Sequence, residues 1–325
     1  MLNFPTIFSI AHALVAALGM SFNLLLIYLA LFQTPRVMRS YSTLIVNYAI
    51  TDFSACLCDL FVQQRIIPAG LTLGYVSNGL CKHFGPTACY VGYSLMLHFF
   101  SHSLWSLLLS FSYRYYILFK PSPTRYHLCI VVFLVYTPSL LQWVSFLWAQ
   151  DDPDEIMDIL TKQFPTYDLK DHVVSGTKNI ICFSALYTIL HMTLPITPVY
   201  ICILLLRRKI VERLNFKGVN VTKDTKNLHS QLLMALTYQA IIPGFYLFSV
   251  ASYAIGQFRF YNHPALEYCT FTSVLFIPLL SPLASFIFVS HYRKFITKNV
   301  LKLANIEQSE TSISPYYTRK AHTIG

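Results

Sequence analysis

Apolar residues in this chain form long uninterrupted runs and do not alternate with polar residues. Runs such as LLLIYLALF and LCIVVFLVY lack the two-residue period of a membrane-barrel strand. A helix needs about 20 mostly apolar residues to cross a hydrocarbon core of roughly 30 Å. The stretches that reach this length lie at about Ile7–Phe32, Leu44–Val62, Phe84–Leu118, Leu128–Trp148, Ile180–Leu206, Leu232–Ile255 and Leu266–Val289. The pattern therefore predicts an all-α membrane protein built as a bundle of seven transmembrane helices.

Composition agrees with a membrane protein. The 325 residues are 55% hydrophobic and 12% charged, with a mean hydropathy of +0.51. About a quarter of the residues in an average soluble domain are charged, so this chain lacks the polar side chains to cover a soluble globule. We expect residues 1–303 to form one membrane domain. Residues 304–325 form a polar tail, which we expect to be cytoplasmic and disordered.

Basic residues are concentrated in alternate connections between the predicted helices. The connections after the first, third, fifth and seventh helices hold 18 of the 24 Lys and Arg residues. The remaining six are Arg65, Lys82, Lys162, Lys170, Lys178 and Arg259. Positive charge is retained in the cytoplasm, so we expect an extracellular N-terminus and a cytoplasmic C-terminus. The net charge of +10 then faces anionic membrane lipid, and no nucleic-acid partner is needed to explain it.

The segment after the last predicted helix, SHYRKFITKNVLKL, runs from Ser290 to Leu303. Its apolar residues and its basic residues fall on two sides of a helix. This pattern predicts an amphipathic helix lying on the inner leaflet, and a disordered basic tail is the alternative.

Polar side chains inside a membrane need a reason, because an ionisable group there costs about 2.5–3.5 kcal/mol on insertion scales. The candidates for a polar core are Asn23, Asn47, Asp52, Ser281 and Pro282. Asp52 either holds a cation or a proton, or forms hydrogen bonds to Asn23 and Ser281 that only fix helix packing. The sequence leaves both interpretations open.

Polar and aromatic side chains in the outer halves of the predicted helices indicate a ligand pocket open to the outside. The candidates are His98, His102, Tyr187, His191, Tyr246 and Phe271. Ordinary aromatic packing would explain the same residues. His98 and His102 have a spacing that suits a metal, but His191 is the only plausible further ligand, so we expect no metal. Nothing resembles a nucleophile with its base or a phosphate loop, so we expect neither an enzyme nor a cofactor.

Most of the eight cysteines lie in apolar runs, where cysteine behaves as a small hydrophobic residue. Cys81, Cys182 and Cys269 are near the predicted outer membrane edge, where disulfides can form. From these we predict a disulfide between Cys81 and Cys182.

The third predicted helix ends on Arg114, which lies among tyrosines in the segment SYRYYILFKPSPTRYH. Three interpretations of an arginine at this depth remain open: a membrane-interface anchor, a satisfied structural residue, or part of a switch that another protein reads. The neighbouring Tyr113 and Tyr115 suit the membrane boundary, because each has an apolar ring and a polar hydroxyl.

Several segments carry a family resemblance. NYAITDF resembles the Asn-x-Ala-x-x-Asp pattern of rhodopsin-like receptors. FQTPRVMRSYSTLIVNYAITDF, HSLWSLLLSFSYRYYIL and HSQLLMALTYQAIIPGF resemble the nematode chemoreceptors called serpentine receptor class delta, and the likeness runs to about Lys302. It implies an olfactory-type G-protein-coupled receptor in the multi-pass membrane of a sensory-neuron cilium, binding a small odorant or pheromone-like molecule. The G-protein interface that it implies comprises Arg114, Tyr113, Tyr115, Lys223 and Lys226.

The chain departs from rhodopsin-like receptors in three places. Tyr113 stands where they have an acidic residue, Ser281-Pro282 replaces their Asn-Pro-x-x-Tyr, and residues 149–179 hold no cysteine. Two other classes remain possible. A seven-helix ligand-gated channel would have a cytoplasmic N-terminus, which the distribution of basic residues disfavours. A small-molecule transporter would have matched interrupted helices in two halves, and the sequence offers no such pair.

Overall fold

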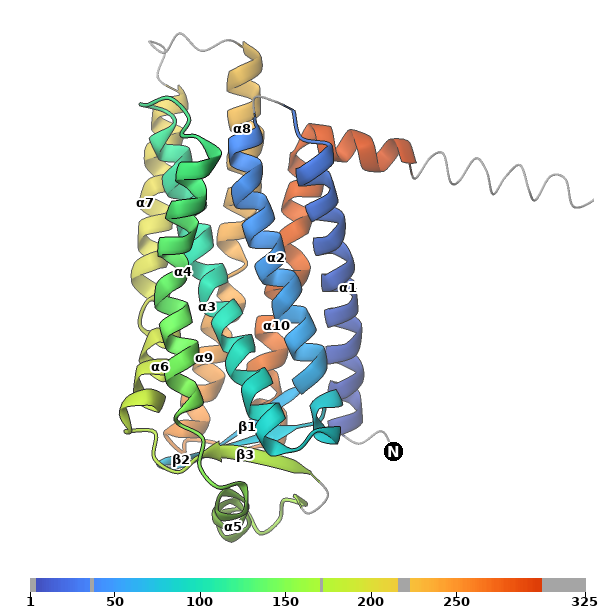
Figure 1. Ribbon diagram of the computed structural model, residues 1–325, viewed down its shortest axis with the longest axis vertical. Coiled ribbons are helices and arrows are strands. Elements are labelled where there is room, and N and C mark those ends of the chain that lie inside the picture. The colour runs from blue at the N-terminus through green and yellow to red at the C-terminus, as the bar shows by residue number, and fades with distance from the viewer. Residues whose placement is uncertain (1–3, 36–37, 170–171, 216–222, 300–325) are drawn as a thin grey trace, which may run out of the picture.

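The computed structural model describes residues 4–35, 38–169, 172–215 and 223–299. Within them, seven helical segments run side by side and are long and apolar enough to cross a membrane (Figure 1). Four of these segments are the single helices α1 (Phe4–Phe32), α2 (Arg39–Val62), α3 (Pro86–Tyr116) and α4 (Arg125–Leu147). The predicted seven-helix bundle is therefore confirmed.

The fifth and sixth segments are each broken at a proline. The fifth consists of α6 (Phe183–Thr193) and α7 (Ile196–Asn215), and the sixth consists of α8 (Lys223–Ile241) and α9 (Gly244–Gln257). Pro195 and Pro243 lie at the two breaks. A proline ring removes a backbone donor and collides with the preceding turn, which explains both interruptions.

The seventh segment, α10 (Pro264–Phe288), continues through Pro278 and Pro282. Because Pro282 has no N–H, the carbonyl of Pro278 loses its partner within the helix. Asn23 Nδ2 on α1 donates a hydrogen bond to that carbonyl at 2.9 Å. A polar side chain of one helix thus satisfies the backbone of another, which the membrane itself cannot do.

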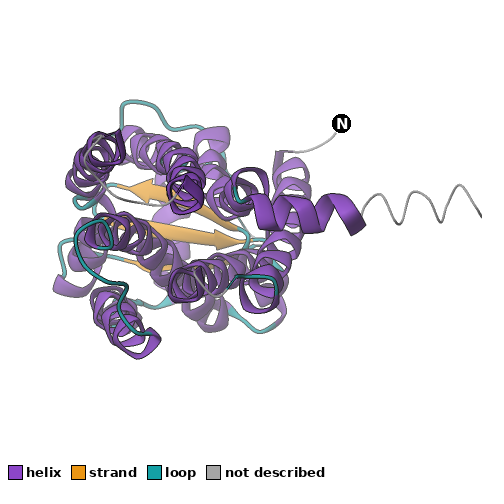
Figure 2. Cartoon of the chain, turned by 90° about the horizontal axis from the view of Figure 1, so that it is seen from above, coloured by secondary structure: helices purple, strands orange, loops and turns teal. Residues whose placement is uncertain are grey.

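One end of the bundle, called here the sheet end, carries a three-stranded antiparallel sheet. Its strands are β1 (Gln64–Ala69), β2 (Thr72–Ser77) and β3 (Val173–Thr177), in the order β1-β2-β3. Figure 2 shows the sheet lying across the bundle. The prediction of a purely α-helical chain is wrong in this respect. Each strand is only five or six residues long, and β3 is about a hundred residues from β2, so no local pattern revealed the pairing.

Helix α5 (Pro153–Gln163) covers the face of the sheet that points away from the bundle (Figure 1). Ile156 and Leu160 are fully buried there. Gly74 and Gly176 face each other across β2 and β3, and a Cβ on Gly74 would lie 2.4 Å from Leu160 Cδ1. The paired glycines therefore let α5 pack closely against the strands.

The cysteine pairing differs from the prediction. Cys81 lies in the short helix η2 (Leu80–His83) and forms a disulfide with Cys89 in the first turn of α3, whereas Cys182 is free. The predicted Cys81–Cys182 bridge is therefore wrong. Helix η2 leads directly into α3, so Cys81 and Cys89 have Cα atoms only 5.0 Å apart. Cys89 falls inside the predicted apolar span Phe84–Leu118, so its position in the sequence does not reveal the bond.

Residues 290–299 form a helix that turns away from the bundle axis at the end opposite the sheet (Figure 1). Tyr292 is buried and its hydroxyl lies 2.7 Å from Thr34 Oγ1, while Arg293, Lys294 and Lys298 are exposed. The expected helix is thus present over these residues, and its contact with lipid stays a prediction. Residues 300–303 and the predicted tail at 304–325 lie outside the described residues.

We expect alkylation to distinguish the two disulfide pairings. With the full-length chain unfolded but not reduced, Cys182 should react with iodoacetamide, whereas Cys81 and Cys89 should react only after reduction. Peptide mass spectrometry of the digested chain reads each site separately. Protection of Cys182 before reduction would contradict the pairing with Cys89.

Candidate functional site

A cavity of about 90 Å³ lies inside the bundle directly beneath the sheet. Ile66 of β1 and Leu73 and Tyr75 of β2 form its roof. Side chains from α3, α4, α6, α9 and α10 form its walls. Enclosed cavities between bundle helices are common places for small molecules to bind.

Helical periodicity explains how the walls are built. Tyr93, Leu97 and Phe100 lie on one face of α3, since they are spaced by about one and two helical turns. Tyr246 and Tyr253 lie two turns apart on α9 and face the cavity in the same way.

Aromatic rings fix the shape of the upper cavity. The Tyr93 ring lies 4.6 Å from that of Tyr75 and meets Phe271 edge-on at 5.5 Å. Phe146 of α4 completes the cluster at 6.0 Å from Tyr93. Edge-on and tilted ring pairs of this kind are favourable and hold the side chains in place.

The lining of the cavity is neutral. Among the described residues, no Asp, Glu, Lys, Arg or His lines it. Its polar atoms belong to hydroxyl groups, including those of Tyr93, Thr188, Ser249 and Thr270. A charged molecule would lose its hydration here without gaining an opposite charge, which is costly. The cavity therefore suits an uncharged molecule.

An ion pair fastens the roof to α10. Arg65 of β1 donates from Nε to Glu267 Oε2 at 2.7 Å, and both side chains are buried. Tyr167, which follows α5, donates its hydroxyl to Glu267 Oε1 at 2.8 Å, and its ring lies 4.8 Å from the guanidinium. Burial, together with the Glu267 carboxylate, raises the pKa of Tyr167. Arg65, Tyr167 and Glu267, called here the roof latch, thus join three separate parts of the chain.

The structure divides the predicted ligand residues into two groups. Tyr246 and Phe271 line the cavity. His98 and His102 do not line it, because their rings face Tyr136 of α4 at 4.7 and 4.1 Å.

Tyr187 and His191 also lie outside the cavity wall. Their rings stack on each other at 5.7 Å, and His191 also stacks on Trp105 of α3 at 6.5 Å. The cavity residues that sequence analysis missed include Tyr75, Tyr93, Met192 and Tyr253. For Tyr93 and Tyr253, the available signal is the spacing of aromatic residues along α3 and α9.

The predicted polar core is present in a different arrangement. Asp52 is 1% exposed and accepts a hydrogen bond from Ser103 Oγ at 2.9 Å. Asn47 Nδ2 donates to Ser106 Oγ at 2.9 Å. Ser281 Oγ lies 2.9 Å from the Tyr48 hydroxyl. The expected hydrogen bond from Asn23 to Asp52 is absent from the described residues, because Asn23 binds the carbonyl that Pro282 frees.

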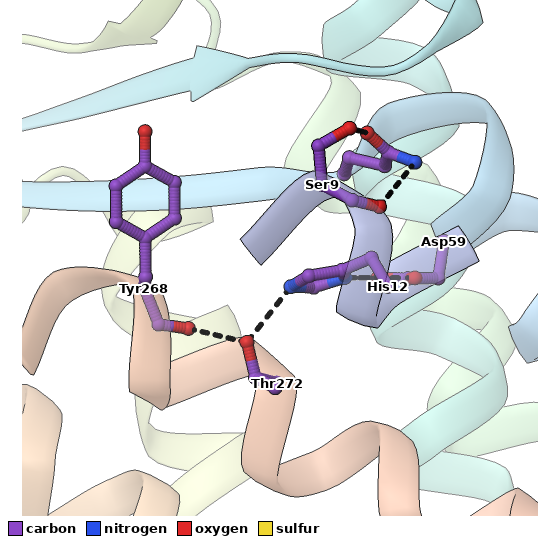
Figure 3. Close-up of polar contacts among 6 residues, drawn as sticks. Ser9, His12, Asp59, Tyr268 and Thr272 are labelled. Carbon is purple, nitrogen blue, oxygen red and sulfur yellow. Dashed lines mark hydrogen bonds and ion pairs between the residues drawn. The ribbon is translucent and has the colours of Figure 1, made fainter. Parts of the chain in front are cut away.

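A second buried acid, Asp59, has a partner that sequence analysis missed (Figure 3). His12 Nδ1 lies 2.9 Å from both Asp59 oxygens, and its Nε2 lies 2.9 Å from Thr272 Oγ1. Thr272 donates its own proton to the Tyr268 carbonyl at 3.0 Å. The two nitrogens of the His12 ring therefore link the Asp59 carboxylate on one side to the Thr272 hydroxyl on the other. The pair joins α1, α2 and α10.

Arg114 is buried, with 4% of its surface exposed. Its guanidinium carbon lies 3.8 Å from the centre of the Tyr41 ring on α2, and Tyr113 stacks on the same ring at 5.8 Å. Its Nε and Nη2 have no hydrogen-bond partner among the described residues. The half-buried Tyr115 lies 5.9 Å from Lys209 Nζ. The side chains of Lys223 and Lys226 lie outside the described residues.

Two small voids continue from the cavity toward Arg114. The first, of about 10 Å³, shares Tyr246 and Phe100 with the cavity and is also lined by Tyr48. The second, of about 20 Å³, shares Tyr48 with the first and reaches Tyr41. A line of loosely packed positions therefore connects the cavity with the ring that holds Arg114.

Comparison with known proteins gives a consistent result. Residues 8–298 match the family model described as "Serpentine type 7TM GPCR chemoreceptor Srd". Serpentine receptor class delta-18 of Caenorhabditis elegans is 41% identical over 318 residues, which cover 96% of this chain and 94% of the relative. Serpentine receptor class delta-19 of the same organism is 43% identical over 296 residues, covering 90% and 87%.

The solved structure of squid rhodopsin is similar in fold. It aligns with a TM-score of 0.63 over 92% of this chain and 82% of its own, at 15% sequence identity. At this identity the likeness concerns the fold alone, which is that of a rhodopsin-like seven-helix bundle.

Removing one member of the His12–Asp59 pair should destabilise the bundle. Asp59→Ala leaves a buried charge or an unsatisfied donor on His12, and we expect a loss of about 3–5 kcal/mol in unfolding free energy. The combined change His12→Leu with Asp59→Leu removes both polar groups and should recover most of the loss. Thermal unfolding of the detergent-solubilised chain measures all variants. Equal melting temperatures for wild type and Asp59→Ala would contradict this role.

Proposed function

This chain belongs to the Srd family of serpentine seven-transmembrane chemoreceptors, and on that premise we propose that it detects a small external molecule bound in the cavity. The family consists of receptors and not enzymes, as the sequence indicated. The observation that carries the proposal is the neutral, aromatic cavity between the helices beneath the sheet. The family described is one of chemoreceptors, which fits a cavity made for a small molecule.

We further propose that the sheet end faces the outside of a sensory-neuron cilium and that the Arg114 end faces the cytoplasm. The distribution of basic residues supports this orientation, because Arg207, Arg208 and Lys209 lie at the Arg114 end. A heterotrimeric G protein would then meet the end of the bundle where Arg114 and Tyr115 lie.

The proposed signal passes from the cavity to Arg114 through the line of voids. A molecule that moves Tyr246 or Phe100 changes the packing around the first void, and Tyr48 lines both voids. The second void reaches Tyr41, whose ring holds the Arg114 guanidinium by a cation–π contact. Release of that contact would free the arginine for a docking helix of the G protein, whose C-terminal end attracts a cation.

The cavity assignment is tested by filling the cavity. We expect Val274→Phe, which adds bulk at a lining position, to reduce responses at least ten-fold. The assay applies a panel of small neutral, acidic and basic volatiles to cells that express the chain with a G protein and a calcium indicator. The matched control is Phe248→Trp, on the exposed face of α9 and outside the cavity.

An antibody to an N-terminal tag, applied to unpermeabilised cells, measures the surface level of each variant so that responses can be compared at equal expression. Its binding also shows whether the N-terminus is extracellular. Full responses from Val274→Phe at equal surface level would contradict the cavity assignment. If neither the wild type nor either variant responded to any volatile in the panel, the chemosensory proposal would be contradicted.

Arg114→Lys tests the proposed switch. Lysine keeps the charge but loses the planar guanidinium that stacks on Tyr41. We expect this variant to reach the surface normally and to signal at least five-fold less to the G protein. Arg125→Lys, an exposed arginine at the same end, serves as the control and should signal normally. Normal signalling by Arg114→Lys would leave Arg114 as a structural residue.

A further inference from the structure

The structure also bears on the class of molecule that the cavity accepts and on how that molecule reaches it, an inference that rests on the proposed function. We infer that the cavity takes a small, uncharged, lipid-soluble molecule that enters sideways from the bilayer, between α6 and α9. The route through water at the sheet end is closed by the roof.

The roof is closed by several independent contacts. All six residues of β1 and of β2 are buried, and β2 is hydrogen-bonded to a neighbour on both sides. The roof latch holds β1 to α10, and Gln257 Nε2 of α9 donates to the Gly70 carbonyl at 2.6 Å. Lys178 and Glu155 form an ion pair across the outer surface of the sheet. A molecule arriving from water would have to break these contacts together.

The walls differ from one another in exposure. Lining residues on β1, β2, α3, α4 and α10 are buried. The lining residues that are partly exposed all belong to α6 and α9, and they are Ile189, Met192, Thr193, Val250 and Tyr253. Side chains that line a cavity and also reach the outer surface of the bundle mark the place where the cavity opens.

The boundary between α6 and α9 is thin. Helix α6 packs mainly on α4, and α9 packs on α10 and β1. The hydrogen bond that joins α6 to α9 in the described residues runs from the Tyr246 hydroxyl to Met192 Sδ at 3.4 Å, and such bonds to sulfur are weak. Outward from it, Leu190 and Leu247 are exposed apolar residues of the kind that face lipid. The opening, called here the α6–α9 gap, therefore faces the hydrocarbon.

The two proline breaks lie beside this gap. Pro195 follows α6 and Pro243 precedes α9, so neither helix continues unbroken into its partner segment. A broken helix can change its tilt at the break without disrupting a continuous hydrogen-bond ladder. The end of each segment nearer the sheet can therefore move apart from the other more readily than unbroken helices could.

The lining and the route select the same chemical class. A molecule dissolved in lipid is uncharged, and the cavity offers hydroxyl groups but no charge. The volume of about 90 Å³ is smaller than an engineered apolar cavity of about 150 Å³ that binds benzene. The expected molecule is thus a small neutral volatile with at most one or two hydrogen-bonding groups.

Timed photolabelling tests the route without any known agonist. The full-length chain is prepared in open membrane fragments, so that both faces of the bilayer meet added reagents. One sample receives 3-ethyl-3-methyldiazirine, a neutral lipid-soluble carbene precursor about as large as benzene, and another receives its water-soluble trimethylammonium derivative. Flashes at increasing delays trap each reagent, and mass spectrometry reads labelling at Tyr93 and Phe271. Both residues are buried cavity residues that lipid does not touch.

We expect the neutral 3-ethyl-3-methyldiazirine to label Tyr93 and Phe271 and the charged derivative to leave both unlabelled. Thr193→Trp, which narrows the α6–α9 gap, should slow labelling of these residues at least five-fold. Leu247→Trp, on the lipid face of α9 but outside the cavity, should not slow it. Labelling of the lipid-facing Leu190 in the same molecules corrects for reagent concentration and for misfolded protein.

A roof variant provides the opposite test. Arg65→Gln with Glu267→Gln removes both charges of the roof latch, and under lateral access it should leave the labelling rate of Tyr93 unchanged. Faster labelling of this variant, labelling of Tyr93 by the charged derivative, or an unchanged rate in Thr193→Trp would each overturn the inference. Absence of label from the neutral diazirine at both Tyr93 and Phe271 would overturn it as well.

The photolabelling does not depend on signalling, so the proposed function and the proposed lateral route can be contradicted independently of each other. A chain that labels as expected but responds to no volatile would contradict the proposed function alone. A chain that responds to volatiles but admits the charged derivative would contradict only the lateral route.

Discussion

The hydrocarbon of a membrane offers no hydrogen-bond partner, and this constraint decides where the polar atoms of the bundle lie. Each interruption of a transmembrane helix frees a carbonyl that another part of the chain has to satisfy. Asn23 meets that demand for the carbonyl released by Pro282, and in doing so it fixes α1 against α10. Gln239 of α8 also binds the backbone of α10, since its Nε2 donates to the Ser281 carbonyl at 3.2 Å. The helices of this chain are thus held together by hydrogen bonds from side chains to backbone carbonyls as well as by apolar contacts.

Charges obey the same constraint in three different ways. Glu267 is paired with Arg65, Asp59 is paired with His12, and Arg114 faces an aromatic ring. The two ion pairs lie toward the sheet end and tie α10 to β1 and to α1 and α2. A buried ion pair contributes little net stability compared with apolar packing, but it is expensive to break by removing one partner. Such pairs therefore fix which elements meet. Arg114 has no carboxylate partner among the described residues, and its Nε and Nη2 have no hydrogen-bond partner there, so it is the more easily released charge.

The sequence predicted the seven spans because their length and apolar composition are local properties. The sheet escaped prediction because its strands are short and pair across distant connections. Of the predicted ligand residues, Tyr246 and Phe271 line the cavity. The others lie on helices that border the cavity, but their side chains are on faces that point elsewhere. Helix α3 is buried on nearly all sides, so apolar periodicity does not reveal which face meets the cavity and which meets α4. His98 and Leu97 are neighbours in sequence, yet one faces Tyr136 and the other lines the cavity. The pairing of Cys89 with Cys81 was not predicted for a similar reason, because the buried first turn of α3 has the same apolar composition as the middle of a transmembrane helix.

The roof and the α6–α9 gap together explain why the lining of the cavity carries no charge. A sheet whose strands are buried and latched by charges resists water, because each contact that opens exposes a polar group to be rehydrated. The opposite holds at the gap, where apolar side chains exchange contact with one another for contact with lipid at little cost. A cavity closed toward water and bordered by lipid gains nothing from charged side chains, which would be stranded in a medium of low dielectric. The absence of charge from the described lining, the placement of ion pairs in the roof and the thin α6–α9 boundary are thus three consequences of one arrangement.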